Sequence, residues 1–323
     1  MSSDDGGIIC VSTNFYVKQL DKNETCLLPL VMCFRRKIIG FIIAFLIIPP
    51  LFFPGLAEPA ETVYFSAITL YHPIVMYQKY QPLMDYLTKN TPYRFELKLS
   101  QNYRDIINFL KSNKVQVALL GGVTYLEAKK EFGVIPILKP LGADGKPFYR
   151  CVFITSNANK EINSLSDLKG KSVAFASKLS TSGNLAPLYR LYTAGIRLQD
   201  LARYANFRYH DSVAREVLRG NFDAGAVIDS VANRFKDRGL KIIAVSGPIP
   251  GLPIVMRADA SPKLMKAIKK ALLALDYNNP EHRKIMEQWD EEFRYGFAEA
   301  KDLDYEPVRK MIHYLNKKGL KIP

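Results

Sequence analysis

Between residues 62 and 245 the sequence alternates short apolar runs with amphipathic stretches, and this alternation limits the fold more than any other feature. The apolar runs have strand length and are rich in β-branched residues, while the stretches repeat apolar residues at helical spacing. Such a rhythm is typical of α/β proteins with mostly parallel sheets. The predicted elements are strands at 63–69, 93–99 and 115–120, helices at 74–89, 102–113 and 124–130, and further strand–helix units at 171–191, 205–218, 224–235 and 242–245.

Two extended segments, 149–155 and 252–257, predict two crossings between two lobes. We expect residues 58–150 and 256–323 to form lobe one, with a helical C-terminal part from Ser261 that packs on it, and residues 151–255 to form lobe two. Two lobes joined by two strands make a hinged cleft that can close on a ligand. In α/β sheets, ligands bind beyond the carboxyl ends of the strands, so the loops that follow the strands are expected to line this cleft.

The first 57 residues predict export. Three basic residues at 35–37 precede the apolar run 38–48, and prolines and a Gly55-x-Ala57 sequence follow. This order is typical of a secretory signal peptide cleaved near Ala57. A transmembrane anchor is the alternative, but the prolines cut the apolar run short of the ~20 residues that a span needs. Met32 stands where a signal peptide would begin, so we expect an over-extended gene start before it; whether the true start is Met1 or Met32 stays open.

Loss of this segment would change the cysteine content but lower the net charge by only one. Cys10, Cys26 and Cys33 would be removed, and Cys151 alone allows no intrachain disulfide and no cysteine-based metal site. Cys151 lies in an apolar alternation and is expected to be a small buried thiol. The first 57 residues hold five Lys/Arg and four Asp/Glu, so the net charge falls only from +14 to +13. This excess favours anionic ligands, while scattered lysines and export argue against nucleic acid.

The strongest candidate for a binding site is the stretch from Ser177 to Gly183, which reads Ser-Lys-Leu-Ser-Thr-Ser-Gly. It joins a predicted buried strand to the start of a predicted helix. Unpaired backbone N–H groups at a helix start, together with the hydroxyls of Ser180, Thr181 and Ser182, would converge on a small oxyanion. The alternative is a plain helix N-cap, a role that Ser and Thr often fill.

Several short motifs occur in a fixed order along residues 63–257. They are Val117-Ala-Leu-Leu-Gly121 with Tyr125 and Ala128, Ser164-Leu-Ser-Asp-Leu-Lys-Gly-Lys-Ser-Val-Ala-Phe175, Ser180-Thr-Ser-Gly183 with Pro187, His210-Asp211, Val217-x-x-Gly-x-x-Asp223-Ala-Gly-Ala-Val227, and Pro248-Ile-Pro250-x-x-Pro253-Ile-Val255. In order and spacing they resemble the periplasmic solute-binding proteins of phosphonate, phosphite and phosphate-type ABC transporters. The resemblance implies an α/β, two-lobed periplasmic-binding-protein (type II) fold with a two-strand hinge, a small phosphorus oxyanion as ligand, a permease as partner and no enzymatic activity.

The resemblance also assigns roles to site residues. It implies that Ser180, Thr181 and Ser182 hold the oxyanion through hydroxyl and backbone N–H groups, and that His210 donates to it. Without the resemblance, a lone histidine is more readily explained as a surface or capping residue.

The residues that follow predicted strands complete the candidate site. Tyr71 and Tyr125 are expected at the cleft, either as ligand contacts or as packed wall residues. Asp229 either binds a ligand amine or caps the next helix. Ser177 belongs to the predicted turn.

The chain departs from the aminoalkylphosphonate binders of this group. Those proteins place acidic residues where this chain has Ser230 and Leu252, and an aromatic residue where it has Leu120. Without those acids a ligand ammonium has no predicted partner. We therefore expect phosphate, phosphite or a simple alkylphosphonate, while another ligand on the same scaffold stays open.

The sequence offers little support for an enzyme. It has no Gly-x-Ser-x-Gly and no His-Glu-x-x-His sequence, and Gly170-Lys171-Ser172 lacks the earlier glycine of a P-loop, because Leu165 stands there. We expect a monomer without cofactor or metal. The remaining alternatives are a binding protein for a sulfonate or a thiamine precursor, and a periplasmic receptor for a sensor kinase.

Overall fold

The computed structural model describes residues 60–322. The predicted signal peptide, its cleavage site near Ala57 and three of the four cysteines lie outside these residues. The described residues belong to one unit by their contacts, and Cys151 is buried in it, as expected. Among the described residues, none of the helices is long and apolar enough to cross a membrane.

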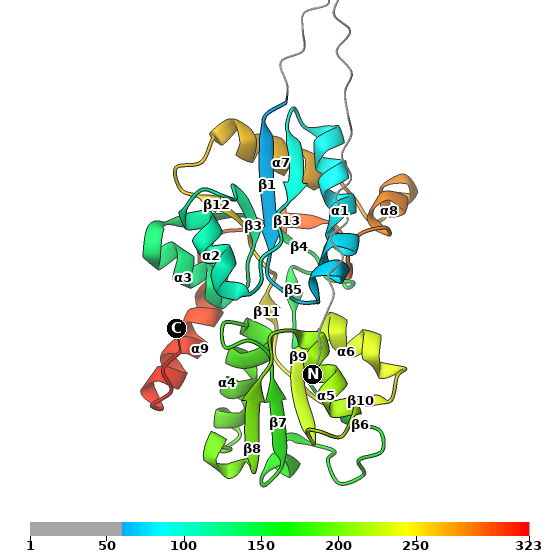
Figure 1. Ribbon diagram of the computed structural model, residues 1–323, viewed down its shortest axis with the longest axis vertical. Helices are drawn as coiled ribbons and strands as arrows, with labels where there is room; N and C mark the ends of the chain where they lie inside the picture. The colour runs from blue at the N-terminus through cyan, green and yellow to red at the C-terminus, as the bar shows by residue number, and fades with distance from the viewer. Residues whose placement is uncertain (1–59, 323) are drawn as a thin grey trace, which may run out of the picture. The chain divides into compact units, whose positions relative to one another are not determined.

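Two large sheets organise this unit (Figure 1). The first sheet, in spatial order, contains β13 (Phe297–Glu299), β4 (Val134–Pro140), β12 (Ile254–Arg257), β3 (Val117–Leu119), β1 (Thr62–Ala67) and β2 (Arg94–Leu97). The second contains β10 (Leu240–Val245), β6 (Cys151–Ser156), β9 (Ala224–Ile228), β7 (Ser172–Phe175) and β8 (Arg203–Asn206). We call the halves built on these sheets lobe one and lobe two.

Each sheet is parallel in one half and antiparallel in the other, so the expectation of mostly parallel sheets was wrong. β1 pairs in parallel with β2 and β3, and β7 with β8 and β9. β12 runs antiparallel to β3 and β4, and β6 runs antiparallel to β9 and β10. β6 and β12 follow the two crossings between lobes. They therefore enter their sheets from the side of the hinge and run antiparallel to the neighbouring strands, which follow helices.

Helices cover the sheets at the predicted places, with ends that differ by a few residues. Those of lobe one are α1 (Pro73–Asn90), α2 (Tyr103–Lys111), α3 (Gly122–Phe132), α7 (Pro262–Leu273) and α8 (Pro280–Met286); those of lobe two are α4 (Ala186–Thr193), α5 (His210–Leu218) and α6 (Asp229–Lys236). Helix α2 illustrates the local cause. The side chain of Asn102 accepts hydrogen bonds from the N–H groups of Arg104 and Asp105 and so begins the helix, and Ile106, Ile107 and Leu110 form its buried face.

A short antiparallel pair joins the lobes: β5 (Phe148–Tyr149) with β11 (Ile249–Pro250). In Figure 1 this pair lies between the two large sheets. The segments predicted as crossings, 149–155 and 252–257, instead contain β6 and β12, which belong to the sheets. The hinge therefore lies a few residues earlier at each crossing, while the exact domain boundaries at 150/151 and 255/256 stay predictions.

The C-terminal part is not purely helical and does not pack on lobe one alone. β13 adds a strand to the edge of the first sheet. Helix α9 (Glu306–Lys317) contacts α3 of lobe one, α4 of lobe two and β11 of the hinge. The rings of Tyr189 on α4 and Tyr314 on α9 meet edge to face, with centres 5.1 Å apart. Three residues without an alternating pattern gave no strand signal for β13.

Candidate functional site

The Ser180–Gly183 turn follows β7 and forms a widened, π-type helical turn, η2 (Thr181–Leu185), before α4. Ser180 caps it, and its Oγ accepts a hydrogen bond from the N–H of Gly183 at 3.0 Å. A Cβ on Gly183 would lie 2.3 Å from the Ala176 Cβ and 2.7 Å from His210 Cε1, so the close packing requires glycine. Single π-type turns are frequent at functional sites.

The three hydroxyl residues of the turn are buried, with at most 3% of each exposed. Thr181 Oγ1 accepts a hydrogen bond at 3.0 Å from the N–H of Val123 in the first turn of α3. The turn of lobe two therefore faces the N-terminus of a helix of lobe one. Backbone N–H groups and the positive end of a helix dipole favour an anion at such a place.

His210 holds the turn from behind. It is fully buried, its Nδ1 accepts a hydrogen bond from the Ile228 N–H at 3.0 Å, and its Nε2 lies 3.0 Å from Ser180 Oγ. Because Nδ1 is an acceptor, the ring proton lies on Nε2 and is donated to Ser180. Burial lowers the pKa of His210 to about 3, so the ring is neutral. Both ring nitrogens are thus occupied, and His210 reaches the site through Ser180; its predicted role as a direct donor to the anion stays a prediction.

Tyr71 lies where the lobes meet. The Arg234 guanidinium lies over its ring, 4.5 Å from the centre, and the Lys79 ammonium lies at 5.2 Å. Burial raises the pKa of Tyr71, and the nearby carboxylates of Asp290 and Glu292 raise it further. Its hydroxyl therefore keeps its proton and can donate.

Three other predicted residues have protein partners. Tyr125 donates its hydroxyl to Asp302, in line with the alternative of a packed wall residue. Ser177 Oγ accepts from the Leu179 N–H at 3.3 Å and shapes the loop. Asp229 begins α6, where its carboxylate accepts from the N–H groups of Arg150 at 2.9 Å and Ser230 at 3.0 Å. Burial raises the pKa of Asp229 to about 6.

Two tyrosines that sequence reasoning missed lie beside the turn. Tyr103 begins α2, is 1% exposed, and its hydroxyl has no hydrogen-bond partner in the described part of the chain. Tyr149 in the hinge strand β5 is 7% exposed. Burial raises the pKa of both, and the hydroxyls of Ser180 and Thr181 lower those of Tyr103 and Tyr149, respectively. The strand-end rule that selected Tyr71 applies equally to Tyr103, which follows β2. Tyr149 begins the predicted crossing 149–155, which indicated a passage between the lobes but no contact with the site.

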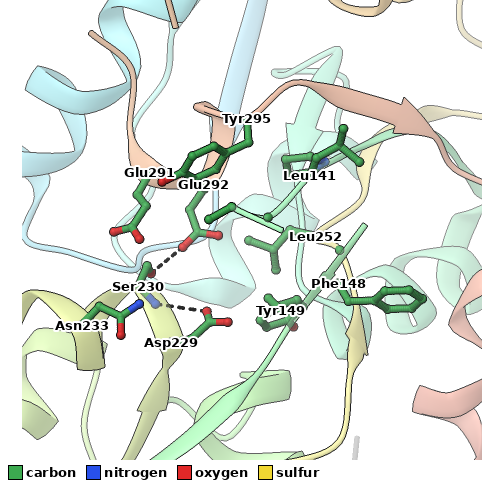
Figure 2. A pocket seen from close by; sticks show the side chains of 14 residues that line it. Leu141, Phe148, Tyr149, Asp229, Ser230, Asn233, Leu252, Glu291, Glu292 and Tyr295 are labelled. Carbon is green, nitrogen blue, oxygen red and sulfur yellow. Dashed lines mark hydrogen bonds between the residues drawn. The ribbon is translucent and has the colours of Figure 1, made fainter. Parts of the chain in front are cut away.

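A cavity of about 110 Å³ opens where residues 291–295 face the start of α6. In Figure 2, Glu291, Glu292 and Tyr295 lie on one side of it, and Asp229, Ser230 and Asn233 on the other. Ser230 Oγ donates a hydrogen bond to Glu292 Oε1 at 2.6 Å across the two lobes. Sequence reasoning missed both glutamates, because their segment contains no motif and reads as part of a helical tail.

Tyr149 is the residue that the cavity and the surroundings of the turn have in common. It lines the cavity, and its pKa, besides responding to burial, responds to the Thr181 hydroxyl and to the Glu292 carboxylate.

Comparison with known proteins places this chain in a family. Residues 65–305 match the family model described as ABC transporter, phosphonate, periplasmic substrate-binding protein. The phosphonates-binding periplasmic protein of Escherichia coli is 27% identical over 75% of this chain and 73% of its own length. The phosphate-import protein PhnD of Mycolicibacterium smegmatis is 26% identical over 77% of this chain and 84% of its own length.

Solved structures agree in fold. A binding protein component of an ABC phosphonate transporter from Pseudomonas aeruginosa has a TM-score of 0.71 at 22% identity and covers 79% of this chain and 86% of its own. A Prochlorococcus marinus protein solved in complex with methylphosphonate has a TM-score of 0.70 at 21% identity, covering 80% and 99%. The predicted two-lobed, type II periplasmic-binding-protein fold with a two-strand hinge is thus confirmed.

These matches span both lobes and the hinge between them, and they describe transporter components that bind a substrate without converting it. The expectation that the chain is not an enzyme is confirmed with them. The chain belongs to the family of periplasmic substrate-binding proteins of phosphonate ABC transporters.

Proposed function

We propose that this protein captures a small phosphorus oxyanion between its lobes and presents it to an ABC permease. One observation carries the proposal: the buried Ser180–Thr181–Ser182 turn of lobe two faces the N-terminus of α3 in lobe one. Relatives with named phosphorus ligands, among them a probable phosphite-binding protein of Prochlorococcus marinus that is 24% identical over 69% of this chain and 81% of its own length, support the same ligand class.

The geometry indicates which groups of the turn can donate hydrogen bonds to an anion. Ser180 accepts from both His210 and Gly183, so its own proton is available to an anion. Thr181 Oγ1 accepts from the Val123 N–H of lobe one, so the hydroxyl proton of Thr181 is likewise available to an anion. Because the His210 ring is neutral, the oxyanion would be held by hydrogen bonds and helix ends rather than by a cation on the turn.

Closure of the lobes would complete the site. In the structure the backbone N–H of His210 donates to the carbonyl oxygen of Leu70 at 3.2 Å, which joins the start of α5 to the loop that follows β1. Donors from each lobe are brought together only when the lobes meet, so ligand binding and closure would stabilise each other. A closed form is the one that a permease would recognise. We further propose that the protein acts as a monomer after a signal peptide is cleaved near Ala57.

A thermal-shift panel tests the ligand class. The purified protein is heated with phosphate, phosphite, methylphosphonate, 2-aminoethylphosphonate, sulfate, taurine and a thiamine precursor. A ligand at 100 times its Kd stabilises the native state by about 2.7 kcal/mol, which raises Tm by several degrees. We expect a rise with at least one phosphorus compound and none with sulfate. A panel in which no phosphorus compound raises Tm overturns the proposal.

A further inference from the structure

A groove of about 350 Å³ lies beside the hinge, where helix α9 contacts α4 and β11 (Figure 1). We call it the hinge groove. Its lining residues come from α4 (Ala186, Tyr189 and Arg190), from the segment 246–249 that leads into β11, and from α9 (Pro307, Lys310 and Met311). It shares no lining residue with the turn or with the cavity of Figure 2. Its volume is within the range of about 300–1,000 Å³ that small-molecule sites occupy, so it has room for a ligand of its own.

The walls of the hinge groove are largely apolar. Tyr189, Pro248 and Ile249 line it from lobe two and the hinge, and Pro307 and Met311 line it from α9. An aromatic ring, two prolines and a polarisable thioether pack well against a flat apolar body. The walls therefore favour a ligand with an apolar, preferably aromatic, part.

Two cations stand in this apolar wall, Arg190 on α4 and Lys310 on α9. Neither forms an ion pair within residues 60–322. No carboxylate lines the groove. Its charge is thus of one sign, and charge complementarity favours an anionic ligand.

Arg190 gives a second reason to expect an anion. Its side chain is half-buried, and its Nε donates to no atom in the described part of the chain. Buried polar atoms without a partner are rare in native proteins and indicate a missing ligand or water. A guanidinium without a protein carboxylate is also the group best suited to an organic carboxylate, which it binds through two parallel N–H···O bonds.

We propose that the hinge groove is a second binding site, for an organic anion with a flat apolar body such as an aromatic carboxylate. Arg190 and Lys310 bind the carboxylate from two helices, and Tyr189, Pro248 and Met311 pack against the apolar part. A ligand in this place touches α4 of lobe two, the hinge, and α9, which also contacts α3 of lobe one. It would therefore join elements of both lobes without entering the oxyanion site.

Titration calorimetry with two matched probes tests the inference. 2-Naphthoate and 2-naphthamide have the same ring system, but only the first is an anion. We expect the purified protein to bind 2-naphthoate at least tenfold more tightly. Arg190→Gln should weaken 2-naphthoate by about tenfold to a hundredfold, the range for a hydrogen bond to a charged group. Lys310→Gln, on an exposed side chain that is not needed for folding, should weaken it by about twofold to fivefold, as for an exposed ion pair.

The controls separate the possible failures. Lys317→Gln makes the same change on an exposed lysine of α9 outside the groove, and Thr181→Ala changes the oxyanion turn; neither should alter the Kd of 2-naphthoate. Binding of neither probe, equal affinity for the two, or a loss as large in either control variant as in Lys310→Gln overturns the proposed groove site and leaves the oxyanion function standing. Self-association of the native protein that Lys310→Gln abolishes would assign the groove to a second copy of the chain, and would overturn the proposal as well.

Discussion

The turn at residues 180–183 and the cavity of Asp229, Glu291 and Glu292 lie side by side but are built in opposite ways. The turn is neutral, local in sequence and held by internal hydrogen bonds from Gly183 and His210. The cavity is lined by carboxylates from segments 62 residues apart, and these three carboxylates form no ion pair within the described residues. A turn built from neighbouring residues is therefore visible in the sequence as a motif, whereas a group of carboxylates from distant segments depends on how the chain folds.

We expect the largest loss of stability from a change at His210, which is hydrogen-bonded to Ser180 of the turn. His210→Ala removes the acceptor of the Ile228 N–H and the donor to Ser180, and leaves a void in a fully buried place. We expect a loss of about 3 kcal/mol or more in the free energy of unfolding, together with weaker oxyanion binding. Urea unfolding monitored by circular dichroism measures the loss. His313→Ala, on an exposed part of α9, is the matched control; similar stability of both variants would contradict this role for His210.

Gly183→Ala tests whether the turn is packed as closely as described. The added methyl would lie 2.3 Å from Ala176 Cβ, so the turn must shift. We expect a loss of roughly 1–3 kcal/mol in stability, the usual cost of overpacking, and a measurable fall in Tm. At Gly247 a Cβ would meet nothing within 4 Å, so Gly247→Ala should change Tm little. A Gly183→Ala variant as stable as the native protein would show that the turn has room for a methyl group and is not closely packed.

The buried carboxylates of the cavity should make the free energy of unfolding depend on pH. Asp229 has a pKa of about 6 in the folded protein, above the ~3.9 of an unfolded chain. The folded state therefore binds more protons between these values, and stability falls as pH rises from about 4 to about 6. Glu291 and Glu292 face Asp229 with raised pKa values and should add to the fall, while Arg234 on α6 and Lys79 on α1 oppose it.

Asp229→Asn should flatten this pH dependence by on the order of 2 kcal/mol between pH 4 and pH 7, since one raised carboxyl is removed. Chemical unfolding at a series of pH values measures the slope. Asp237→Asn, at the exposed end of the same helix, should keep the native slope. Identical slopes for Asp229→Asn and the native protein would mean that the pKa of Asp229 is not raised in the folded state.

The smallest expected effect on stability comes from Thr181→Ala. It removes the hydroxyl that meets the Val123 N–H, in a place that the ligand would share. We expect the affinity for a phosphorus oxyanion to fall by about tenfold, the value of one hydrogen bond to a charged group, with stability within about 1 kcal/mol of native. Titration calorimetry measures the affinity, with exposed Thr193→Ala as the control. Undiminished binding by the variant would remove Thr181 from the site.

The sequence could predict the parts of the fold and site that depend on neighbouring residues. The strands, the helices and the strand–turn–helix order around Ser180 follow from local periodicity and capping. The three-residue β13 and the two-residue hinge strands are too short to show a period. Tyr125 follows a strand as predicted, but its hydroxyl bonds to Asp302, 177 residues away, which no local rule can indicate.

The same limit applies to the carboxylates of the cavity. The absence of acidic residues at Ser230 and Leu252 predicts a site without carboxylates only if no other part of the chain brings a carboxylate there. Glu292 reaches Ser230 from a short turn, η4 (Glu291–Phe293), that ordinary sequence patterns do not distinguish from a solvated helix end. Charge in a cleft is a property of the assembled lobes, so it has to be read from contacts.

Helix α9 contacts both lobes and the hinge. It packs on α3, α4 and β11, and Tyr314 meets Tyr189 edge to face. We therefore expect opening of the lobes to break this ring contact, and helix α9 to slow ligand release. Stopped-flow release of a bound phosphonate from Tyr314→Ala should therefore be faster than from the native protein, and an unchanged rate would show that the helix rides with one lobe only. In a binding protein that delivers its ligand to a transporter, the helix would then set how long the ligand stays bound, while the residues of the cleft set which ligand binds.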